Sequence, residues 1–375
     1  MIPRVTATVD LSAIQHNLRV ARALAPRSRV MAPVKADAYG HGAVPVSRAL
    51  EAAGVDALAV ACLEEAMELR QAHIIAPIAL LEGVISHEEA ALAVYERLQV
   101  VVHDHWQIAL LEALPDSAQL SLWFKLDSGM HRLGFPLGDV PRLVAVLRRH
   151  PNWKLEGWIT HLACADEPDS EFTPQQIARF DAALTGVPGP RSIANSAGLI
   201  AWPQARVDWV RPGLALYGCS PMPNLSAATL GLRPAMTLES RLIAVREYAA
   251  GESVGYGRRY VCPERMPVGV VAVGYADGLH RAFANGTPMI VNGVRVPLAG
   301  RVSMDMITVD LRAVPSAQVG DAVQLWGSGL PAEEVAGHAG TLAYELFCGL
   351  TQRVHFRHVE PDAAGAEARS AQRGR

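Results

Sequence analysis

Short hydrophobic runs alternate with segments of helical periodicity along the first 230 residues of the chain. Eight of these runs have the length and the apolar content of buried strands. They span residues 29–35, 57–61, 77–82, 98–102, 119–126, 155–161, 191–194 and 208–211. Most are separated by stretches in which apolar residues recur at the α-helical period, as in residues 63–71 and 140–149. Alternating helices and buried strands predict a parallel sheet.

Eight strand–helix units within about two hundred residues fit a closed (β/α)8 barrel of the TIM type. An open, doubly wound sheet is the structural alternative. That fold binds dinucleotides through a G-x-G-x-x-G turn after its first strand, and no such turn follows residues 29–35. The sequence therefore predicts the α/β class, with an N-terminal (β/α)8 barrel.

The pattern changes near residue 230. Shorter apolar runs, at residues 240–246, 269–275, 289–291, 294–298 and 306–311, are joined by turns rich in Gly, Pro and Asn. Asn292-Gly293 between two of these runs is a strong hairpin signal. We expect a barrel over residues 1–230, a β-rich C-terminal domain over residues 231–361, and pairing of the first few residues with that second domain. Residues 362–375 contain no large apolar side chain, so we expect a disordered tail.

Length and composition support this division. A chain of 375 residues exceeds the ~250–300 residues at which single cores stop growing, which favours two domains. The formal net charge of −3 gives no electrostatic reason to expect nucleic acid or an acidic membrane as partner. No run reaches the ~18 apolar residues of a membrane span, and the N-terminus lacks a signal pattern. The five cysteines are scattered and have neither metal-ligand nor C-x-x-C spacing, so we interpret them as reduced thiols of a cytoplasmic protein.

Polar residues stand where five of the barrel strands are expected to end, which is the rim that carries function in such barrels. They are Lys35, Lys125, Thr160-His161, Asn195-Ser196 and Arg211-Pro-Gly213. Lysine is rarely buried without a partner, and a desolvated amine can become a nucleophile toward carbonyl groups. Lys35 is therefore a candidate Schiff-base residue. The alternative is an ordinary strand-end lysine that reaches into solvent.

A set of motifs in fixed order covers almost the whole chain. They are Ala32-Pro-Val-Lys35-Ala-Asp-Ala-Tyr39-Gly-His-Gly, Lys125-Leu-Asp-Ser-Gly-Met-His-Arg132, Ile159-Thr-His161, Asn195-Ser196, Arg211-Pro-Gly213, Gly255-Tyr256-Gly257, Gly274-Tyr275-Ala-Asp-Gly278 and Gly300-Arg301-Val-Ser-Met304-Asp305. In these motifs the chain resembles the bacterial alanine racemases, which are fold-type III enzymes dependent on pyridoxal 5′-phosphate (PLP). The resemblance implies interconversion of L- and D-alanine by proton transfer at Cα.

The same resemblance assigns residues to the cofactor. Lys35 would hold PLP covalently and serve as one of two bases. Arg211 would face the pyridine nitrogen; because guanidinium keeps its proton, that nitrogen would stay unprotonated, which disfavours transamination. The remaining cofactor residues, several of them donors to the phosphate, would be Tyr39, His161, Asn195, Ser196, the backbone near Gly213, and Tyr344.

Racemisation needs a base on each face of the substrate, and the resemblance assigns the second base to Tyr256. Tyrosine is a weak base at neutral pH. A hydrogen-bonded chain Tyr256–His161–Arg211 would favour its deprotonated form. In relatives the residue matching Lys125 is carbamylated and positions the residue matching Arg132, which would contact substrate. The plain alternative is a free Lys125 paired with Asp127 or another acid.

The resemblance also describes an entrance and an assembly. Met304 would bind the substrate carboxylate through its backbone N–H, with Asp305 beside it. A polar corridor would comprise Asp166, Tyr275, Arg281 and Arg301. Ser303 and Ala343 depart from residues that are common in the family, which leaves the exact substrate range open. The active unit would be a homodimer in which the two bases of one site come from different chains.

Three other functions compete with this interpretation. They are a racemase for a broader range of small amino acids, an amino-acid decarboxylase of the same barrel type, and a non-catalytic PLP carrier. The decarboxylase class places an acidic residue at the pyridine nitrogen, where this chain has Arg211. The carrier lacks the β domain with Tyr256. His103-Asp-His105 resembles a metal-binding pattern but has no further ligand nearby in the sequence, so we expect no metal.

Overall fold

The computed structural model of the protein describes residues 3–360. The chain divides into two compact units. The barrel unit comprises Gln15–Leu216 and Ser220–Leu232, and the β unit comprises the rest of the described chain. The expected tail at residues 362–375 lies outside the described residues. No helix within residues 3–360 is long and apolar enough to cross a membrane.

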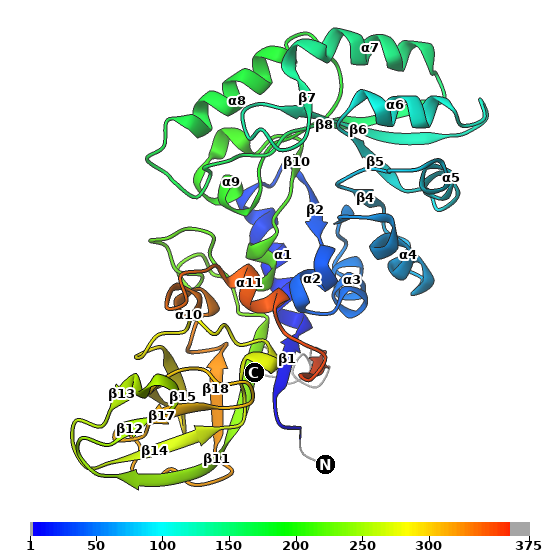
Figure 1. Cartoon of the computed structure of the whole chain (residues 1–375). Coiled ribbons are helices and arrows are strands. Elements are labelled where there is room, and N and C mark those ends of the chain that lie inside the picture. Colours follow the sequence, from blue (N-terminus) through cyan, green and yellow to red (C-terminus); the bar gives the residue numbers. More distant parts are fainter. Residues whose placement is uncertain (1–2, 361–375) are drawn as a thin grey trace, which may run out of the picture. The chain divides into compact units, whose positions relative to one another are not determined.

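Eight parallel strands close into a barrel, as the sequence predicts (Figure 1). Neighbouring strands follow the order β5-β4-β3-β2-β10-β9-β8-β6, and pairing of β5 with β6 closes the ring. A ninth, very short strand, β7 (Phe135–Pro136), pairs with β6 beyond the ring. The eight are β2 (Arg29–Pro33), β3 (Ala57–Val60), β4 (Ile78–Leu80), β5 (Gln99–Val102), β6 (Leu120–Asp127), β8 (Trp153–Ile159), β9 (Arg191–Ser192) and β10 (Trp209–Val210).

Large and small side chains share the barrel interior. Trp123 and Trp209 meet edge to face, with ring centroids 5.6 Å apart, and the Trp123 indole donates to Gln99 Oε1 at 2.8 Å. A methyl group on Gly157 would lie 2.5 Å from the Trp123 ring, so this close approach requires glycine. The core cluster consists of Met31, Ala57, Ala59, Ala79, Val101, Trp123, Ile159 and Trp209. These residues are packed side chains, so function must lie at the strand ends.

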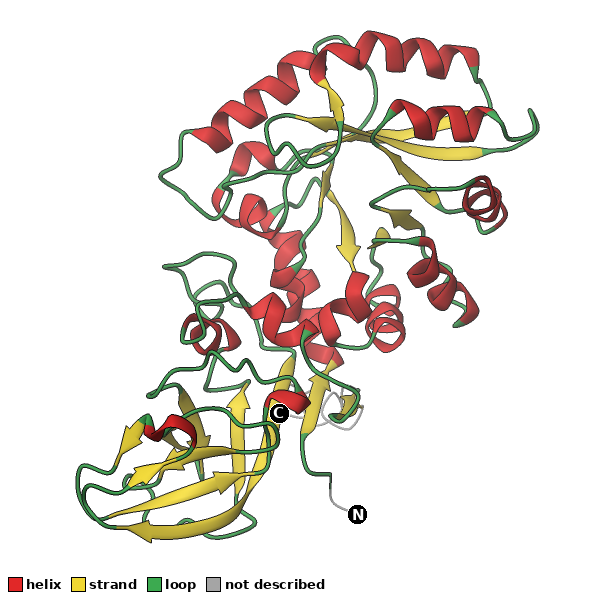
Figure 2. Ribbon diagram, viewed as in Figure 1, coloured by secondary structure: helices red, strands yellow, loops and turns green. Residues whose placement is uncertain are grey.

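Helices flank the barrel strands (Figure 2). Two of them coincide with the ranges predicted from periodicity: α4 (Leu63–Gln71) and α7 (Val140–Arg149). Side-chain caps start α5, where Ser86 accepts from the Glu89 N–H, and α6, where Asp104 accepts from the Trp106 N–H. The others in this part of the chain are α1 (Leu11–Leu24), α2 (Lys35–Gly40), α3 (Ala43–Ala52), α5 (His87–Tyr95), α6 (His105–Glu112), α8 (Phe172–Ala183) and α9 (Ser196–Ala201), with 3₁₀ turns η1 (Leu137–Asp139), η2 (Pro203–Ala205) and η3 (Leu214–Tyr217).

Strands dominate the β unit. Its main sheet contains β1 (Thr6–Asp10), which pairs antiparallel with β11 (Met236–Tyr248) and parallel with β19 (His355–Val359). The predicted hairpin is confirmed: β15 (Pro288–Val291) pairs with β16 (Val294–Pro297), and both Asn292 and Gly293 have positive φ. The remaining elements are β12 (Ser253–Val254), β13 (Tyr260–Val261), β14 (Met266–Val271), β17 (Ile307–Asp310), β18 (Ala322–Trp326), α10 (Ala332–Gly337), α11 (Ala343–Cys348), η4 (Tyr256–Arg258) and η5 (Tyr275–Asp277).

The predicted strand at residues 269–275 differs from the observed element. β14 covers Met266–Val271, and Tyr275 opens the 3₁₀ turn η5. The chain leaves the sheet because Gly274 packs against the backbone of Met304: a methyl group on Gly274 would lie 2.3 Å from the Met304 carbonyl oxygen. This departure brings the turn at Tyr275 against the segment that carries Met304.

Candidate active site

Lys35 lies directly after the first barrel strand, at the start of a turn with unusual backbone geometry. β2 ends at Pro33, and Lys35 opens α2. The next four residues, 36–39, have φ of 51–53°, in the left-handed region. For residues other than glycine this conformation costs roughly 1–2 kcal/mol each, and such strain concentrates at functional sites. The Lys35 side chain is half-buried, and within residues 3–360 its amine has no hydrogen-bond or ion-pair partner.

Two carboxylates hold this turn in place. Glu65, in the first turn of α4, accepts from the backbone N–H of Ala36 and of Ala61, each at 2.7 Å. Asp37 accepts from the Ala43 N–H at 2.6 Å. These bonds satisfy backbone donors at or just before helix N-termini, which have no partner within the helix. Glu65 was not predicted from the sequence, because its only signal there is an acidic residue at a helix start.

Lys125 lies on the inner face of the barrel, two residues after the core side chain Trp123. Burial, followed by the nearby charges of Arg132, Arg211 and Lys35, lowers the pKa of Lys125 to about 8. An amine with this pKa is partly neutral at physiological pH, so it can act as a nucleophile. Because Arg132, Arg211 and Lys35 all lower the pKa of the Lys125 amine, these four cationic side chains lie near one another at this end of the barrel.

The alternative of a Lys125–Asp127 ion pair is wrong. Asp127 is occupied by its own loop: one oxygen accepts from the N–H of Gly129 and of His131, and the other contacts His131 Nδ1 at 2.9 Å. Glu82 is near enough to oppose the fall in the pKa of Lys125. Among residues 3–360, however, no acid lies within ion-pair distance of Lys125, and the cationic cluster lacks a matching anion of the protein.

Arg211 follows β10 and is only 5% exposed. Its guanidinium donates to Ser192 Oγ and to the Thr160 carbonyl, each at 2.5 Å, and to the Ile193 carbonyl at 3.3 Å. Every one of these acceptors is neutral. Burial lowers the pKa of Arg211 to about 10, which still leaves it charged at neutral pH. Ser192 is a positioning residue that no sequence motif singles out.

His161 follows β8 and stays neutral. Burial, followed by the charges of Arg211 and Arg132, lowers the pKa of His161 to about 3. The predicted hydrogen bond between His161 and Arg211 is not present, because Arg211 donates to Ser192 and to two backbone carbonyls instead. The coupling between these two residues is therefore electrostatic.

Donor groups gather around Gly213. A methyl group at Gly213 would lie 2.9 Å from the Tyr39 hydroxyl oxygen. The Tyr39 hydroxyl therefore lies close to the backbone of Gly213, in space that a larger residue's side chain would occupy. Ser196 is buried, and its hydroxyl accepts from the Ala215 N–H at 3.2 Å. Asn195 caps α9 by accepting from the Gly198 N–H at 2.8 Å. This part of the barrel rim thus combines hydroxyl groups with a closely approaching backbone.

Tyr256 lies in the β unit, at the tip of the hairpin formed by β12 and β13. Gly255 and Gly257 on either side of it have φ of 71° and 70°, which explains the Gly-Tyr-Gly sequence. The tyrosine side chain is 70% exposed. A methyl group on Gly255 would lie 4.0 Å from the Arg301 nitrogen, so the hairpin lies beside the segment that leads to Met304.

Met304 and Asp305 lie on a loop that is tied to the turn at Tyr275. The N–H of Tyr275 donates to the Ser303 carbonyl at 3.0 Å, and the N–H of Ala276 donates to the Met304 carbonyl at 2.9 Å. Across the described part of the chain, the Met304 N–H has no hydrogen-bond partner. It is therefore available as a donor to a ligand.

Arg353 fixes this loop and was not anticipated from the sequence. Its guanidinium contacts Asp305 at 2.8 Å and the buried Asp277 at 3.2 Å. Arg4 also donates to the Asp305 carbonyl. Neither arginine belongs to a recognisable motif, and their distance from Asp305 along the sequence conceals the contact.

The other predicted residues are distributed over both units. Asp166 is exposed on the loop between β8 and α8 of the barrel unit. In the β unit, Arg281 and Tyr275 are exposed, Arg301 is partly exposed, and Tyr344 lies near the start of α11. Their convergence into one corridor remains a prediction.

No group of three or more potential metal ligands gathers within residues 3–360. The two histidines of His103-Asp-His105 have separate partners. His103 contacts the Glu82 carbonyl at 3.2 Å, and His105 contacts Asp139 at 2.8 Å.

A lysine after the first strand of a (β/α)8 barrel, a cationic cluster at the other strand ends and a separate β unit are together typical of barrel-type PLP-dependent enzymes. Comparisons with known proteins define the family. Residues 9–221 match the N-terminal domain of alanine racemase and residues 235–358 match its C-terminal domain. The chain therefore belongs to the alanine racemase family, which is PLP-dependent.

Individual relatives agree. The chain is 51% identical to alanine racemase from Nitrosococcus oceani, over 93% of this chain and 97% of that protein. It is 50% identical to the catabolic alanine racemase from Pseudomonas putida, over 92% of this chain and 96% of that protein. The crystal structure of the biosynthetic alanine racemase from Pseudomonas aeruginosa matches with a TM-score of 0.92 at 49% identity, covering 96% of this chain and all of that one.

Proposed function

We propose that the protein is a PLP-dependent racemase that interconverts L-alanine and D-alanine. The observation that carries this proposal is the cluster of cationic side chains at this end of the barrel: Arg211 is buried, Lys125 and Lys35 are partly buried, and within residues 3–360 no acidic side chain pairs with any of them. A buried charge without a partner is costly. A bound substrate carboxylate, together with the carbamate proposed below for Lys125, would supply negative charge at this cluster.

The residues present fit PLP. Lys35 would attach the cofactor, and the hydroxyl groups of Tyr39 and Ser196, with the backbone beside Gly213, would bind its phosphate. Asn195 and His161 would support this region, and Tyr344 would add a further hydroxyl. When bound, PLP withdraws electrons from the substrate Cα and so makes its proton acidic.

Two residues of the chain would move that proton. The Lys35 amine would act on one face of Cα, and the Tyr256 hydroxyl would act on the other. Because a base on each face allows removal on one side and return on the other, the configuration inverts. The exposure of Tyr256 in the isolated chain fits a residue that completes a site in a dimer. We propose a homodimer whose sites each take Lys35 from one chain and Tyr256 from the other.

Arg211 would restrict the reaction to racemisation. Its permanent charge and neutral partners allow it to donate an N–H to the pyridine nitrogen without protonating it. An unprotonated pyridine ring withdraws electrons from the substrate less strongly. The proton would therefore return to Cα, which disfavours transamination. A decarboxylase of this barrel type has an acid at this position, which favours the racemase.

Replacing Arg211 with Glu is expected to increase transamination, because a carboxylate would stabilise a proton on the pyridine nitrogen. The measurement is pyridoxamine phosphate formed per racemisation turnover. Arg211→Lys is the matched control, since it keeps a cation and should leave this ratio low. A folded, cofactor-loaded Arg211→Glu protein with an unchanged ratio would show that Arg211 does not face the nitrogen.

We further propose that Lys125 carries a carbamate. Its neutral amine would attack CO₂, and the proton released would pass to solvent. The resulting anion would lie among Arg132, Arg211 and Lys35 and offset their charge. It would also position Arg132, which would contact the substrate carboxylate together with the Met304 N–H. Asp305, held by Arg353, would fix that loop.

Removal of CO₂ from the buffer is expected to lower activity, and added bicarbonate should restore it. Only the neutral amine reacts, so at constant dissolved CO₂ the rate of recovery should increase as the pH rises through about 8, the pKa of Lys125. A Lys125→Ala protein should show no response to bicarbonate. Absence of a carbamate signal in the ¹³C NMR spectrum of the fully active protein after incubation with ¹³C-labelled bicarbonate would exclude the carbamate.

We also propose that the site selects a substrate with a small side chain. Asp166, Tyr275, Arg281 and Arg301 would form the polar entrance, and Tyr344 would crowd the substrate side chain, which suits a methyl group. A racemase for several small amino acids is the second candidate, since Ser303 and Ala343 depart from common family residues. Chiral assay of alanine and serine distinguishes the two: comparable kcat/KM for both amino acids would favour the broader enzyme.

A further inference from the structure

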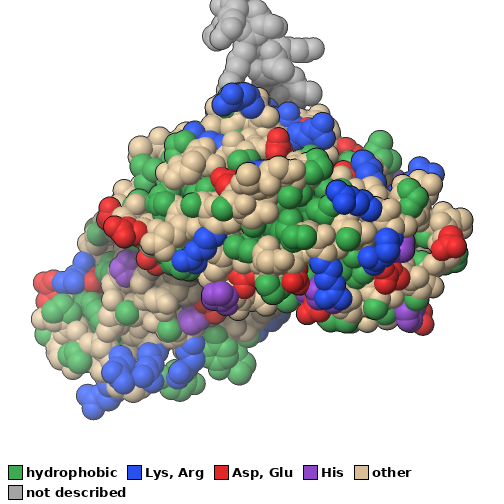
Figure 3. Space-filling view, turned by 90° about the horizontal axis from the view of Figure 1, so that it is seen from above, with side chains coloured by type: hydrophobic (Ala, Val, Ile, Leu, Met, Phe, Trp, Pro, Cys, Tyr) green, Lys and Arg blue, Asp and Glu red, His purple; other side chains and the backbone are tan. Residues whose placement is uncertain are grey.

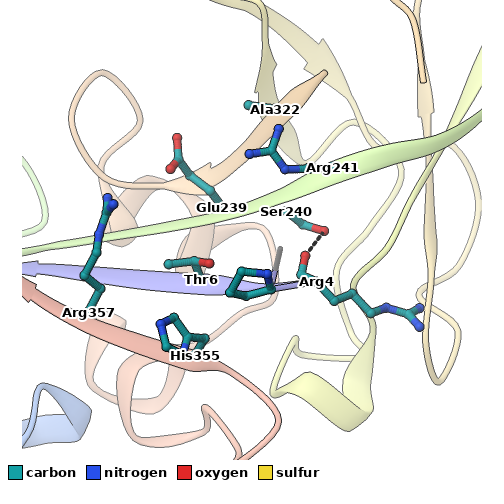
Figure 4. A pocket seen from close by; sticks show the side chains of 9 residues that line it. Arg4, Thr6, Glu239, Ser240, Arg241, Ala322, His355 and Arg357 are labelled. Atoms are coloured by element: carbon teal, nitrogen blue, oxygen red, sulfur yellow. Dashed lines mark hydrogen bonds between the residues drawn. The ribbon is translucent and has the colours of Figure 1, made fainter. Parts of the chain in front are cut away.

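A pocket of about 250 Å³ lies on the main sheet of the β unit, and neither Tyr256 nor Met304 lines it (Figure 4). This volume is many times the roughly 10–15 Å³ that one water needs. Strand register explains its lining: Thr6 pairs with Glu239 on one side and with His355 on the other. Because side chains alternate along a strand, Arg241 and Arg357 share this face, at opposite ends of it: Arg241 lies beyond Glu239 toward Arg4, and Arg357 lies beside Thr8. The pocket is lined by Pro3, Arg4, Thr6, Glu239, Ser240, Arg241, Ala322, His355 and Arg357.

Two guanidinium groups in this pocket have most of their donors available. Arg241 donates to the Gly320 carbonyl at 2.9 Å, and Arg357 donates to Thr8 Oγ1 at 3.0 Å. Each of these is a single bond to a neutral acceptor. Arg4 differs, because its guanidinium is committed to the carbonyls of Ala272 and Asp305, and in Figure 4 it points away from the other side chains.

Glu239 supplies the one acidic group of the lining. It is partly buried, and within residues 3–360 its carboxylate makes no hydrogen bond and no ion pair. Arg241 and Arg357 do not approach it to ion-pair distance, although both line the same pocket. The carboxylate of Glu239 and the guanidinium groups of Arg241 and Arg357 thus line the pocket without pairing with one another.

We propose that this pocket binds a small dicarboxylic α-amino acid, such as glutamate. Its ammonium group would contact Glu239, and its two carboxylates would contact Arg241 and Arg357, with Thr6 and His355 as further polar partners. The three charged side chains carry a net charge of +1, and the ligand carries −1, so the complex is neutral. Arginine is well suited to carboxylates because it donates two parallel hydrogen bonds. This proposal is independent of the proposed racemase activity.

Isothermal titration of the holoenzyme with L-glutamate tests the proposal. Racemic alanine at saturation keeps the active site occupied, so the heat reports a second site. Glutarate lacks the ammonium group, so it should bind at least about tenfold more weakly than glutamate. The absence of saturable binding at glutamate concentrations well above about 1 mM would overturn the proposal.

Substitutions locate the site. Arg357→Gln and Glu239→Gln should each weaken glutamate binding about tenfold, with racemase activity unchanged. Arg246→Gln, at an exposed position further along β11 and outside the pocket, is the matched control and should bind normally. Glu239→Gln should not weaken glutarate binding, because glutarate has no ammonium group. Equal loss of glutamate and glutarate in that variant, or binding unaffected by both pocket substitutions, would show that the assignment is wrong.

Discussion

Replacing Lys35 with alanine is expected to abolish racemisation in both directions. The amine after β2 would both attach the cofactor and serve one face of Cα, so its loss removes two functions at once. Removing a catalytic group of this kind costs several orders of magnitude in rate. The direct measurement is the turnover of each enantiomer. The second is mass analysis after borohydride reduction, which should add the cofactor to Lys35 in the wild type and add nothing to the corresponding peptide of the variant.

Two controls make this result specific. Lys154, on β8, is a largely exposed lysine that pairs with Glu156 at 2.6 Å, and Lys154→Ala should retain wild-type activity and labelling. Circular dichroism should show that the Lys35→Ala protein is folded, since the left-handed turn is held by Glu65 and Asp37 and not by the amine. Wild-type turnover together with reducible cofactor in Lys35→Ala would refute the central assignment.

The barrel was predictable because its strands are buried on both faces. Such strands appear as continuous apolar runs, and each of the eight predicted runs overlaps an observed strand. The strands of the β unit were harder to predict from the sequence. β19 (His355–Val359) has no buried residue, so it lacks the hydrophobic signal of a strand although it pairs with β1 over its full length.

The residues of the candidate site also fall into two groups, those that the sequence identified and those that it did not. Motif residues such as Lys35 and Arg211 were identifiable because their type is unusual at the end of a barrel strand. Their supporting contacts were not, because they depend on three-dimensional register. Ser192 reaches Arg211 across neighbouring strands, and Arg353 reaches Asp305 from 48 positions away. The left-handed turn after Lys35 is also invisible in a sequence where none of residues 36–39 is glycine.

The charged residues of the surface did not help to predict the functional site. In the view of Figure 3, Lys and Arg side chains are interspersed with Asp and Glu, in keeping with the small net charge. The informative charges are the partly buried Lys125 and the buried Arg211, whose pKa values are lowered mainly because these side chains lie away from water. Only the fold shows that such residues share one site.

The proposed dimer leads to a second large effect. If each site takes Lys35 from one chain and Tyr256 from the other, a chain with Lys35→Ala can still donate its tyrosine to a partner. A chain with Tyr256→Phe can still donate its lysine. A dimer with one of each therefore contains one site with both defects and one site with both native bases. Two proteins that are inactive alone are expected to become active when mixed.

Equal amounts of Lys35→Ala and Tyr256→Phe chains, after random exchange, should recover roughly one quarter of the wild-type sites, because half of the dimers are mixed and each has one intact site. The measurement is alanine racemisation after exchange has been verified by native mass spectrometry. The complementary mixture pairs wild-type chains with the Lys35→Ala/Tyr256→Phe double variant. There a composite site leaves only wild-type homodimers active, again roughly one quarter of all sites, whereas a site built from one chain would leave one half. No recovery in the first mixture and one half in the second would show that Lys35 and Tyr256 of the same chain act together.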